Sequence, residues 1–258
     1  MNRRPGVSES DLRRMRDEWD QRAKARPLHY NSPSRQAGEE QIFFEYGRRH
    51  VEQELLGEVQ KLERPEQKRA LEIGCGMGRL MRALAPHFAS IDGVDVSPAM
   101  IKEARSHNPS IEYPTLNFQA NDGSSLPFPD GRFAFVYSMG VLTHLPSRAI
   151  LESYVVETAR VLEPGGRFKL EVPVESGWGR LSGVIPYPRA VKPFVPSFAS
   201  RLALRIYKKD PLKRSDTYIG KGMFRYRLKR IMRDAGLEGA VADTQQGRNG
   251  WLVGRKPA

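Results

Sequence analysis

The fold of this chain is decided by the stretch LEIGCGMG at residues 71–78. A short apolar run contains one acid, Glu72, and then breaks into three glycines separated by single residues: Gly74, Gly76 and Gly78. This pattern is typical of a buried strand that turns sharply into a helix, because glycine allows positive φ and leaves no Cβ between the backbone and a ligand. The helix expected over residues 79–85 would begin with free amide groups that face this ligand.

The spacing of these glycines separates the possible ligands. A dinucleotide-binding turn follows the pattern G-x-G-x-x-G, but the position three residues after Gly76 is Arg79. A phosphate-binding P-loop ends in Gly-Lys followed by Ser or Thr, and this ending is absent from the turn. A carboxylate at Glu72 would repel a pyrophosphate, whereas it suits a ligand with a positive charge such as a free amino group. The turn therefore favours neither a dinucleotide nor a P-loop nucleotide.

Two further expected strands end in acidic residues. The second strand, residues 91–95, ends at Asp95, whose carboxylate could accept hydrogen bonds from both hydroxyls of a ribose. The third strand, residues 118–120, is followed by Asn121-Asp122-Gly123, where the acid could accept a hydrogen bond from an exocyclic amine. In open parallel sheets ligands bind outside the carboxyl ends of the strands. These acids are therefore expected to lie near the glycine turn.

The chain resembles the class I S-adenosylmethionine-dependent methyltransferases, of the broad small-molecule, type 11-like kind. The glycine turn matches the first motif of that family, and Asp95 matches its ribose-binding acid. The adenine-side motif is matched by NDG at 121–123 with LPF at 126–128. A fourth buried strand is expected at 133–139, and VLTHLP at 141–146 matches the family segment that follows it. The turn before the fifth strand is matched by RVLEPGG at 160–166. The resemblance covers residues 69–172 closely, with one departure at Ala134, where the family usually carries an acid.

The resemblance implies an α/β fold, a Rossmann-like, doubly wound, mostly parallel sheet of seven strands with an antiparallel last strand. It implies S-adenosylmethionine as cofactor and S-adenosylhomocysteine as product. The glycine turn would hold the methionine part of the cofactor with Glu72 near its ammonium, Asp95 would hold the ribose, and Asp122 the adenine edge. The implied cofactor-binding residues are Glu72, Gly74, Cys75, Gly76, Gly78, Asp95, Val96, Met100, Asn121, Asp122, Gly123, Ser138, Met139 and Gly140, the last three beside the reacting sulfur.

Around this core the sequence divides into four regions. Residues 1–64 are expected to form an N-terminal helical cap, with helices near 10–25 and 41–61, and residues 65–172 the cofactor-binding core. The segment DEWDQRA at 17–23 resembles the Trp-Asp-x-x-Ala segment that covers the cofactor pocket in many family members. A basic, proline-rich insert follows the fifth strand (168–172) at 173–218. Residues 219–258 are expected to add a helix at 222–235 and a hairpin of strands 239–244 and 251–255.

Composition limits the other classes of function. The chain has 258 residues and a single cysteine, so an internal disulfide is impossible and Cys75 is expected to fill the turn rather than act as a nucleophile. No His or Cys cluster has metal-ligand spacing, which predicts no metal site. No run of about eighteen apolar residues predicts a transmembrane span, and no apolar stretch of a secretory signal follows the basic N-terminus. A cytoplasmic address is the expectation.

The positive charge of the chain is concentrated in one stretch. The formal net charge is +12. Residues 179–233 carry fifteen Lys or Arg and only two acids, Asp210 and Asp216. One interpretation of this basic stretch is a solvated cover, since charge runs usually are solvated faces. Another is a lid whose cationic wall favours an acceptor with a carboxylate, phosphate or sulfate. A third is attachment to an anionic membrane through a basic amphipathic helix at 197–209.

Methyl transfer to a hydroxyl requires a base, because the oxygen is a weak nucleophile until its proton leaves. His144 is the candidate base, because it lies just beyond the fourth strand and histidine titrates near neutral pH. The alternative is that His144 caps or packs the turn at 142–146. The sequence favours methylation, preferably O-methylation, of a small and anionic acceptor metabolite. An RNA methyltransferase, or a non-catalytic binding or regulatory protein that holds nucleic acid or membrane with the basic stretch, remains the alternative.

Overall fold

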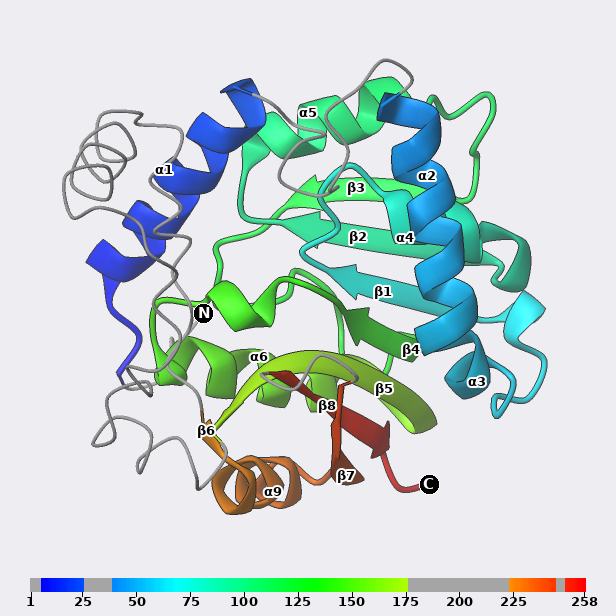
Figure 1. Cartoon of the computed structure of the whole chain (residues 1–258). Coiled ribbons are helices and arrows are strands. Elements are labelled where there is room, and N and C mark those ends of the chain that lie inside the picture. The colour runs from blue at the N-terminus through cyan, green and yellow to red at the C-terminus, as the bar shows by residue number, and fades with distance from the viewer. Residues whose placement is uncertain (1–5, 26–38, 176–222, 245–248) are drawn as a thin grey trace, which may run out of the picture.

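The computed structural model describes residues 6–25, 39–175, 223–244 and 249–258. These residues form a single twisted sheet with helices on both faces (Figure 1). The strand order is β3-β2-β1-β4-β5-β8-β7, and the short strand β6 pairs with the end of β5. Strands β3 to β5 pair in parallel, whereas β8 runs antiparallel to both of its neighbours. The expected mostly parallel sheet of seven strands with an antiparallel last strand is confirmed, and β6 is an addition to it.

The strands are β1 (Arg69–Ile73), β2 (Ser90–Asp95), β3 (Leu116–Ala120), β4 (Phe133–Ser138), β5 (Leu162–Glu175), β6 (Met223–Phe224), β7 (Glu238–Asp243) and β8 (Asn249–Arg255). The α-helices are α1 (Glu9–Ala25), α2 (Glu39–His50), α3 (Leu56–Val59), α4 (Arg79–Leu84), α5 (Pro98–His107), α6 (Arg148–Val161) and α9 (Arg225–Asp234). The shorter helical turns are η2 (Val51–Leu55), η3 (Pro65–Gln67), η4 (Ala85–His87) and η5 (Leu142–His144). Among the described helices, none has the length and apolarity needed to cross a bilayer.

Two apolar clusters pack on the two faces of the sheet. On one face Leu71, Val136 and Phe168 contact a layer that includes Ile150 of α6 and Leu228 of α9. On the other face, side chains of β1, β2 and β4 pack against η2, α4 and α5. The central strands are buried on both faces, and β4 is apolar or small almost throughout because it can present no polar side to water.

The edges of several elements differ from those expected. The helix expected over 41–61 is divided by the π-helical turn η2. Strand β5 begins at Leu162 with a register shift against β4 and continues to Glu175, so the first three residues of the expected insert belong to the strand. The helix expected to start at residue 222 starts at Arg225, because Met223 pairs with Val174 of β5 instead. The rest of the insert, including the helix expected at 197–209, lies outside the described residues.

The strand order reverses between β1 and β4. Strand β1 pairs with β2 on one side and with β4 on the other, so the chain leaves these strands in opposite directions. In open α/β sheets such a switch point, at the carboxyl ends of the strands, is where ligands bind. The glycine turn follows β1 at this point. The fold therefore brings the carboxyl ends of β1, β2, β3 and β4 to one edge, where the candidate site lies.

Candidate cofactor and acceptor site

The glycine turn has the backbone conformation that its sequence predicts. Gly74, Gly76 and Gly78 have φ of 74°, 51° and 79°, in the left-handed region that only glycine adopts at low cost. The amides of Gly74 and Cys75 donate to the Val94 carbonyl at 2.7 and 2.9 Å, which fixes the turn to β2. A Cβ on Gly74 would lie 2.3 Å from Val141. The turn thus requires glycine both for its dihedral angle and for space.

Asp95 closes the turn from the neighbouring strand. Its Oδ2 accepts a hydrogen bond from the Gly76 amide at 3.1 Å, and its Oδ1 accepts one from the Ser97 amide at 3.0 Å. Removal from water raises the pKa of the Asp95 carboxyl to about 6, although these backbone donors oppose the shift. The Val96 amide is a third backbone donor to this carboxylate, whose two oxygens together offer about four acceptor positions, so acceptor capacity remains for a ligand.

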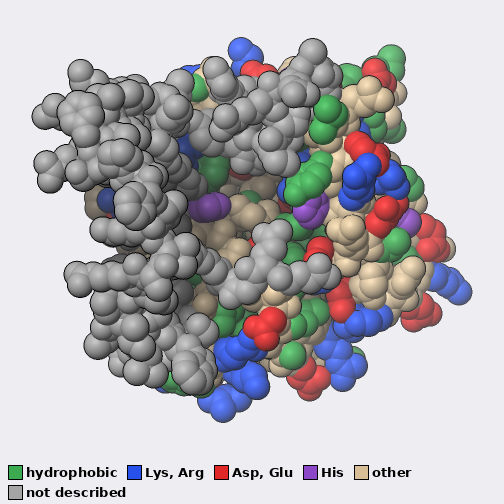
Figure 2. Space-filling model, viewed as in Figure 1, with side chains coloured by type: hydrophobic (Ala, Val, Ile, Leu, Met, Phe, Trp, Pro, Cys, Tyr) green, Lys and Arg blue, Asp and Glu red, His purple; other side chains and the backbone are tan. Residues whose placement is uncertain are grey.

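A cavity at this edge collects many of the residues predicted from the sequence. Those that line it are Gly74, Gly76, Asp95, Val96, Met100, Asn121, Gly140 and His144. The rest of its wall is formed by residues that sequence reasoning did not single out as cofactor-binding: Met15 and Trp19 of α1, Val141, Leu145 and Tyr154. Trp19 belongs to the Trp-Asp-x-x-Ala segment, which was the available signal for it. Figure 2 shows histidine side chains near the middle of the face in view.

The other predicted residues do not line this cavity: Glu72, Cys75, Gly78, Asp122, Gly123, Ser138 and Met139. Ser138 is buried and its hydroxyl donates to the Ile73 carbonyl at 2.8 Å, which ties β4 to β1. Burial raises the pKa of the Cys75 thiol well above its usual value, so the side chain is an inert packing group. Their roles toward the cofactor stay predictions.

Glu72 lies beneath the turn rather than at its surface. The side chain is 2% exposed, and its Oε2 accepts a hydrogen bond from the Tyr137 hydroxyl at 3.2 Å. Burial raises the pKa of this carboxyl to about 8, against the attraction of the nearby Arg79 guanidinium. At neutral pH the group is therefore mainly protonated. A positive charge brought to this edge would lower its pKa again.

Asn121 and Asp122 have different surroundings. Both Asp122 oxygens are used within its own turn, where they accept the amides of Ser124 and Ser125, each at 2.7 Å, and their hydroxyls. Asn121 lines the cavity, and its Nδ2 donates to the Ser125 carbonyl and the Tyr154 hydroxyl. Its buried Oδ1 has no hydrogen-bond partner among the described residues. Asn121 thus keeps an acceptor without a partner among the described residues, whereas both Asp122 oxygens are used within their turn.

Helix α1 is held over the cavity by one carboxylate. Asp20 Oδ1 accepts hydrogen bonds from the Ser97 hydroxyl and from the Ala99 amide at 3.1 Å. The Ser97 hydroxyl in turn accepts the Met100 amide at 3.0 Å, so Asp20 extends the N-terminal cap of α5. One residue earlier, the Trp19 ring contacts His144 edge to face at 6.0 Å between centroids. Trp19 and Asp20 therefore join helix α1 to the edge of the sheet where the cavity lies.

Replacing Asp20 with alanine should loosen α1 from α5. We expect a loss of about 1–3 kcal/mol in the free energy of unfolding, because buried donors of α5 lose their acceptor. Cofactor affinity should fall about tenfold as Trp19 leaves the cavity wall. Thermal unfolding and titration calorimetry measure both effects. Asp17→Ala removes an exposed acid from the same helix and should change neither; equal behaviour of the two variants would exclude α1 from the site.

Glu171 is a second residue that sequence reasoning missed. Its Oε2 accepts the Gly140 amide and its Oε1 accepts Asn249 Nδ2, both at 2.7 Å. Gly140 has a φ of 70° and lines the cavity just beyond β4. The carboxylate of Glu171 therefore sets the turn that carries the cavity wall from β4 to η5. A residue in the middle of a predicted strand gave no signal for this role.

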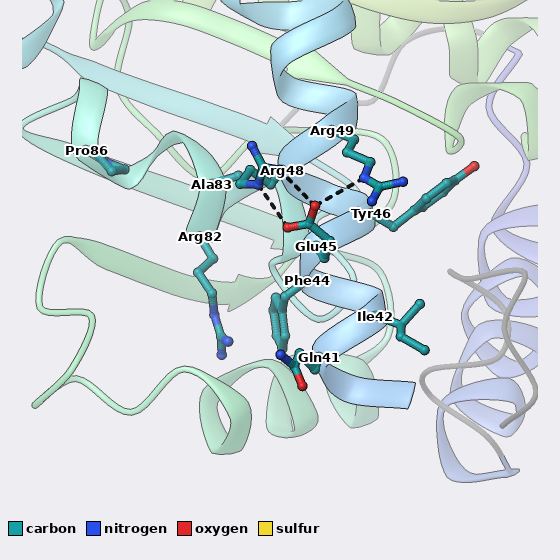
Figure 3. A pocket seen from close by; sticks show the side chains of 10 residues that line it. All are labelled: Gln41, Ile42, Phe44, Glu45, Tyr46, Arg48, Arg49, Arg82, Ala83 and Pro86. Carbon is teal, nitrogen blue, oxygen red and sulfur yellow. Dashed lines mark hydrogen bonds and ion pairs between the residues drawn. The ribbon is translucent and has the colours of Figure 1, made fainter. Parts of the chain in front are cut away.

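A larger recess lies elsewhere, between α2 and α4 (Figure 3). Its volume is about 710 Å³, and it is lined by residues of α2, α4 and η4 that include no glycine of the turn. Glu45 bridges Arg48 and Arg49 across its rim, as the dashed lines in Figure 3 show. The Arg82 guanidinium lies over the Phe44 ring, 3.3 Å from its centroid. Because Arg48, Arg49 and Arg82 already have partners, we do not assign a ligand to this recess.

The comparisons with known proteins agree with this geometry. Residues 70–166 match the family model described as a methyltransferase domain. This chain carries a class I methyltransferase domain. The cofactor of the methyltransferase domain is S-adenosylmethionine. Within the described residues no group of His, Cys, Asp or Glu could hold a metal ion.

Relatives of the methyltransferase domain act on several acceptors. The chain is 35% identical over 97 residues to a 2-methyl-6-phytyl-1,4-hydroquinone methyltransferase of Synechocystis, a match that covers 37% of this chain and 29% of that protein. It is 29% identical over 158 residues to a ubiquinone biosynthesis O-methyltransferase of Coxiella burnetii, covering 61% and 56%. These matches span less than two thirds of the relatives' own lengths.

Among solved structures, the fold is similar to that of magnesium protoporphyrin IX methyltransferase from Synechocystis with bound S-adenosylhomocysteine. The TM-score is 0.60 at 17% identity, and the match covers 93% of this chain and 97% of that one. At this identity the likeness extends to the fold alone.

Proposed function

We propose that this chain transfers a methyl group from S-adenosylmethionine to a hydroxyl of a small molecule, of the hydroquinone or related phenol class. The observation that carries the proposal is the cavity at the switch point, where Gly74, Asp95 and Asn121 share one wall with His144. The methyltransferase domain and the names of its relatives support the reaction type and the acceptor class. An anionic acceptor, expected from the basic insert, stays a prediction because the insert lies outside the described residues.

The residues present fit the cofactor. Gly74 and Gly76 bring bare backbone to the cavity wall, where the methionine part of the cofactor could lie, and Asp95 retains acceptor capacity for the ribose hydroxyls. The free Oδ1 of Asn121 suits an exocyclic amine, which makes Asn121 a candidate for the adenine edge beside Asp122. When bound, the cofactor supplies a sulfonium-activated methyl group that needs alignment more than activation.

The protein groups near the cavity would prepare the acceptor. His144 is the proposed base, because it lies on the cavity wall at the end of η5 and a phenolic oxygen must lose its proton to become a good nucleophile. Trp19 and Met15 would exclude water from the reacting atoms. Glu171 would act as a positioning residue, because it holds Gly140 beside the same cavity.

Titration calorimetry with S-adenosylhomocysteine on the whole chain tests the cofactor, and transfer of a radiolabelled methyl group to 2-methylhydroquinone tests the acceptor class. Binding together with labelled product supports the proposal. Binding without transfer to any phenol would reject the acceptor class, and absence of binding would reject the function as a whole.

Replacing His144 with alanine should lower the rate of methyl transfer by about 10²–10⁴-fold, which is the usual contribution of a general base. Cofactor affinity should change by only a few fold, since the imidazole is not assigned to the cofactor. Rates and affinities of His144→Ala are compared with those of His87→Ala, which removes a histidine of η4 away from the cavity. A rate that survives in His144→Ala would leave only the packing role, in contact with Trp19.

A further inference from the structure

Helix α9 has one buried and one cationic face. Its sequence is RYRLKRIMRD, and Leu228, Ile231 and Met232 are buried in the core. On the opposite side, exposed residues recur at helical spacing: Tyr226, Lys229, Arg230 and Arg233. The core packing fixes the helix, and the exposed residues are therefore held as a stripe along its outer side. We call this stripe the α9 face.

The positive charge of the α9 face is only weakly compensated. Arg225, at the start of the helix, is tied to Asp243 and to the Val241 carbonyl. Arg233 approaches Asp234 at 3.6 Å, with both side chains more than half exposed. Within the described part of the chain, Lys229 and Arg230 have no ion pair. Figure 2 shows Lys and Arg side chains in blue at the lower edge of the view, over α9 and its surroundings.

An aromatic ring leads this cationic stripe. Tyr226 is 66% exposed, which places it among the exposed large hydrophobic side chains of the described residues. Its ring stacks on Phe224, with 5.8 Å between centroids. An exposed tyrosine next to several cations is typical of residues at the level of lipid headgroups, where the ring enters the interface and the charges stay among the phosphates.

We propose that the α9 face docks on the surface of an anionic lipid bilayer. The argument is charge complementarity: Lys229, Arg230 and Arg233 point outward from one rigid helix, and lipid phosphates form a matching planar array. Single-stranded nucleic acid would need several stacking rings, and the α9 face offers one exposed ring. This surface role goes beyond the proposed methyl transfer and does not depend on it. The helix lies on the membrane and does not enter it, since its other face belongs to the core.

Co-sedimentation of the full chain with vesicles tests the proposal. We expect binding to phosphatidylcholine vesicles with 30% phosphatidylglycerol, weak binding to phosphatidylcholine alone, and release by added salt. The variant Lys229→Gln/Arg230→Gln/Arg233→Gln should bind roughly 100-fold more weakly, since each cation near an anionic surface contributes about a fivefold change in partition. The control variant Arg13→Gln/Arg64→Gln/Lys102→Gln removes three exposed cations elsewhere and should retain most of the binding.

A second measurement reports on depth. In a Tyr226→Trp variant, brominated lipids should quench the added fluorescence relative to the parent chain. Equal loss of binding in the two triple variants would overturn the proposal, because net charge and not the α9 face would then be responsible. If the fluorescence of the introduced indole stays unquenched on bound vesicles, the proposal is overturned as well. Binding of an RNA homopolymer that competes fully with vesicles, with no preference for anionic lipid, would assign the face to nucleic acid instead.

Discussion

Replacing Asp95 with asparagine should lower the affinity for S-adenosylmethionine about 100-fold at pH 7.5. The carboxylate is proposed to accept two charge-assisted hydrogen bonds from the ribose, each contributing about 1.5–3 kcal/mol. Asparagine keeps one acceptor oxygen, so about one of these bonds is lost, which corresponds to a loss on the order of 100-fold. The Asp95 carboxylate now accepts hydrogen bonds from the backbone amides of Gly76 and Ser97. In the asparagine variant the side-chain NH₂ group would face one of these amides, so that two donors would meet. Titration calorimetry with the cofactor measures the loss directly.

The pH dependence of this variant gives a second measurement. Because the pKa of Asp95 is raised to about 6, cofactor affinity of the parent chain should fall as pH drops below 6, whereas that of Asp95→Asn should stay level. The stability effect has the opposite sign. A raised carboxyl pKa contributes stability that is complete below about pH 4 and is lost as pH rises through 6, by up to about 3 kcal/mol. The parent apo protein should therefore lose stability relative to the variant over this range.

Asp92→Asn is the matched control for this test. Asp92 lies on the same strand as Asp95, but it is buried against Arg132, 3.2 Å away, and is not part of the cavity wall. This substitution should lower stability and leave cofactor affinity unchanged. If the two variants bind the cofactor equally well, the assignment of the ribose to Asp95 is wrong.

The substitution Gly74→Ala should disrupt both folding and cofactor binding. An alanine at φ 74° costs about 1–2 kcal/mol. Its Cβ would also overlap the Val141 side chain at 2.3 Å, and overpacking of this kind costs about 1–3 kcal/mol more. We expect a loss of roughly 2–5 kcal/mol in the free energy of unfolding, together with loss of measurable cofactor binding. Chemical denaturation and calorimetry measure the two effects.

The double variant Gly74→Ala/Val141→Ala separates the two causes. Removing the Val141 methyl groups relieves the overlap but not the backbone strain, so it should restore part of the stability and little of the binding. Gly57→Ala is the control, because a Cβ at Gly57 meets no atom within 4 Å and its φ is not positive. This control should be neutral or slightly stabilising, since Gly57 lies in helix α3. A fully stable Gly74→Ala protein would contradict the strained turn.

The glycine turn after β1 and the acid at the end of β2 could be predicted from local sequence. Glycines at alternate positions after a buried strand require positive φ and leave no side chain in the way, and all three positions have such φ values. The acid at the end of the next strand lies where a parallel sheet must place it, beside Gly76. These features depend on backbone geometry over a few residues, which a short sequence pattern specifies.

Other parts of the site depend on contacts between segments far apart in the chain. Asp20 and Ser97 are 77 positions apart, and Glu171 and Gly140 are 31 apart. Their hydrogen bonds exist because α1 packs on α5 and because β5 lies beside β4. No spacing within the sequence announces such pairs, since the register of packed elements is set by the whole core.

The sequence by itself determined where the parallel strands lie along the chain, the glycine turn and the acid at Asp95, because these follow from hydrophobic runs and from the dihedral angles that glycine alone adopts. Only the tertiary structure decided which side chains reach the cavity. It buried Glu72 beneath the turn, used up the oxygens of Asp122, left Asn121 Oδ1 free and brought Trp19 against His144. The reason is that burial and hydrogen-bond partnership depend on what packs nearby, and that is fixed when the strands and helices come together.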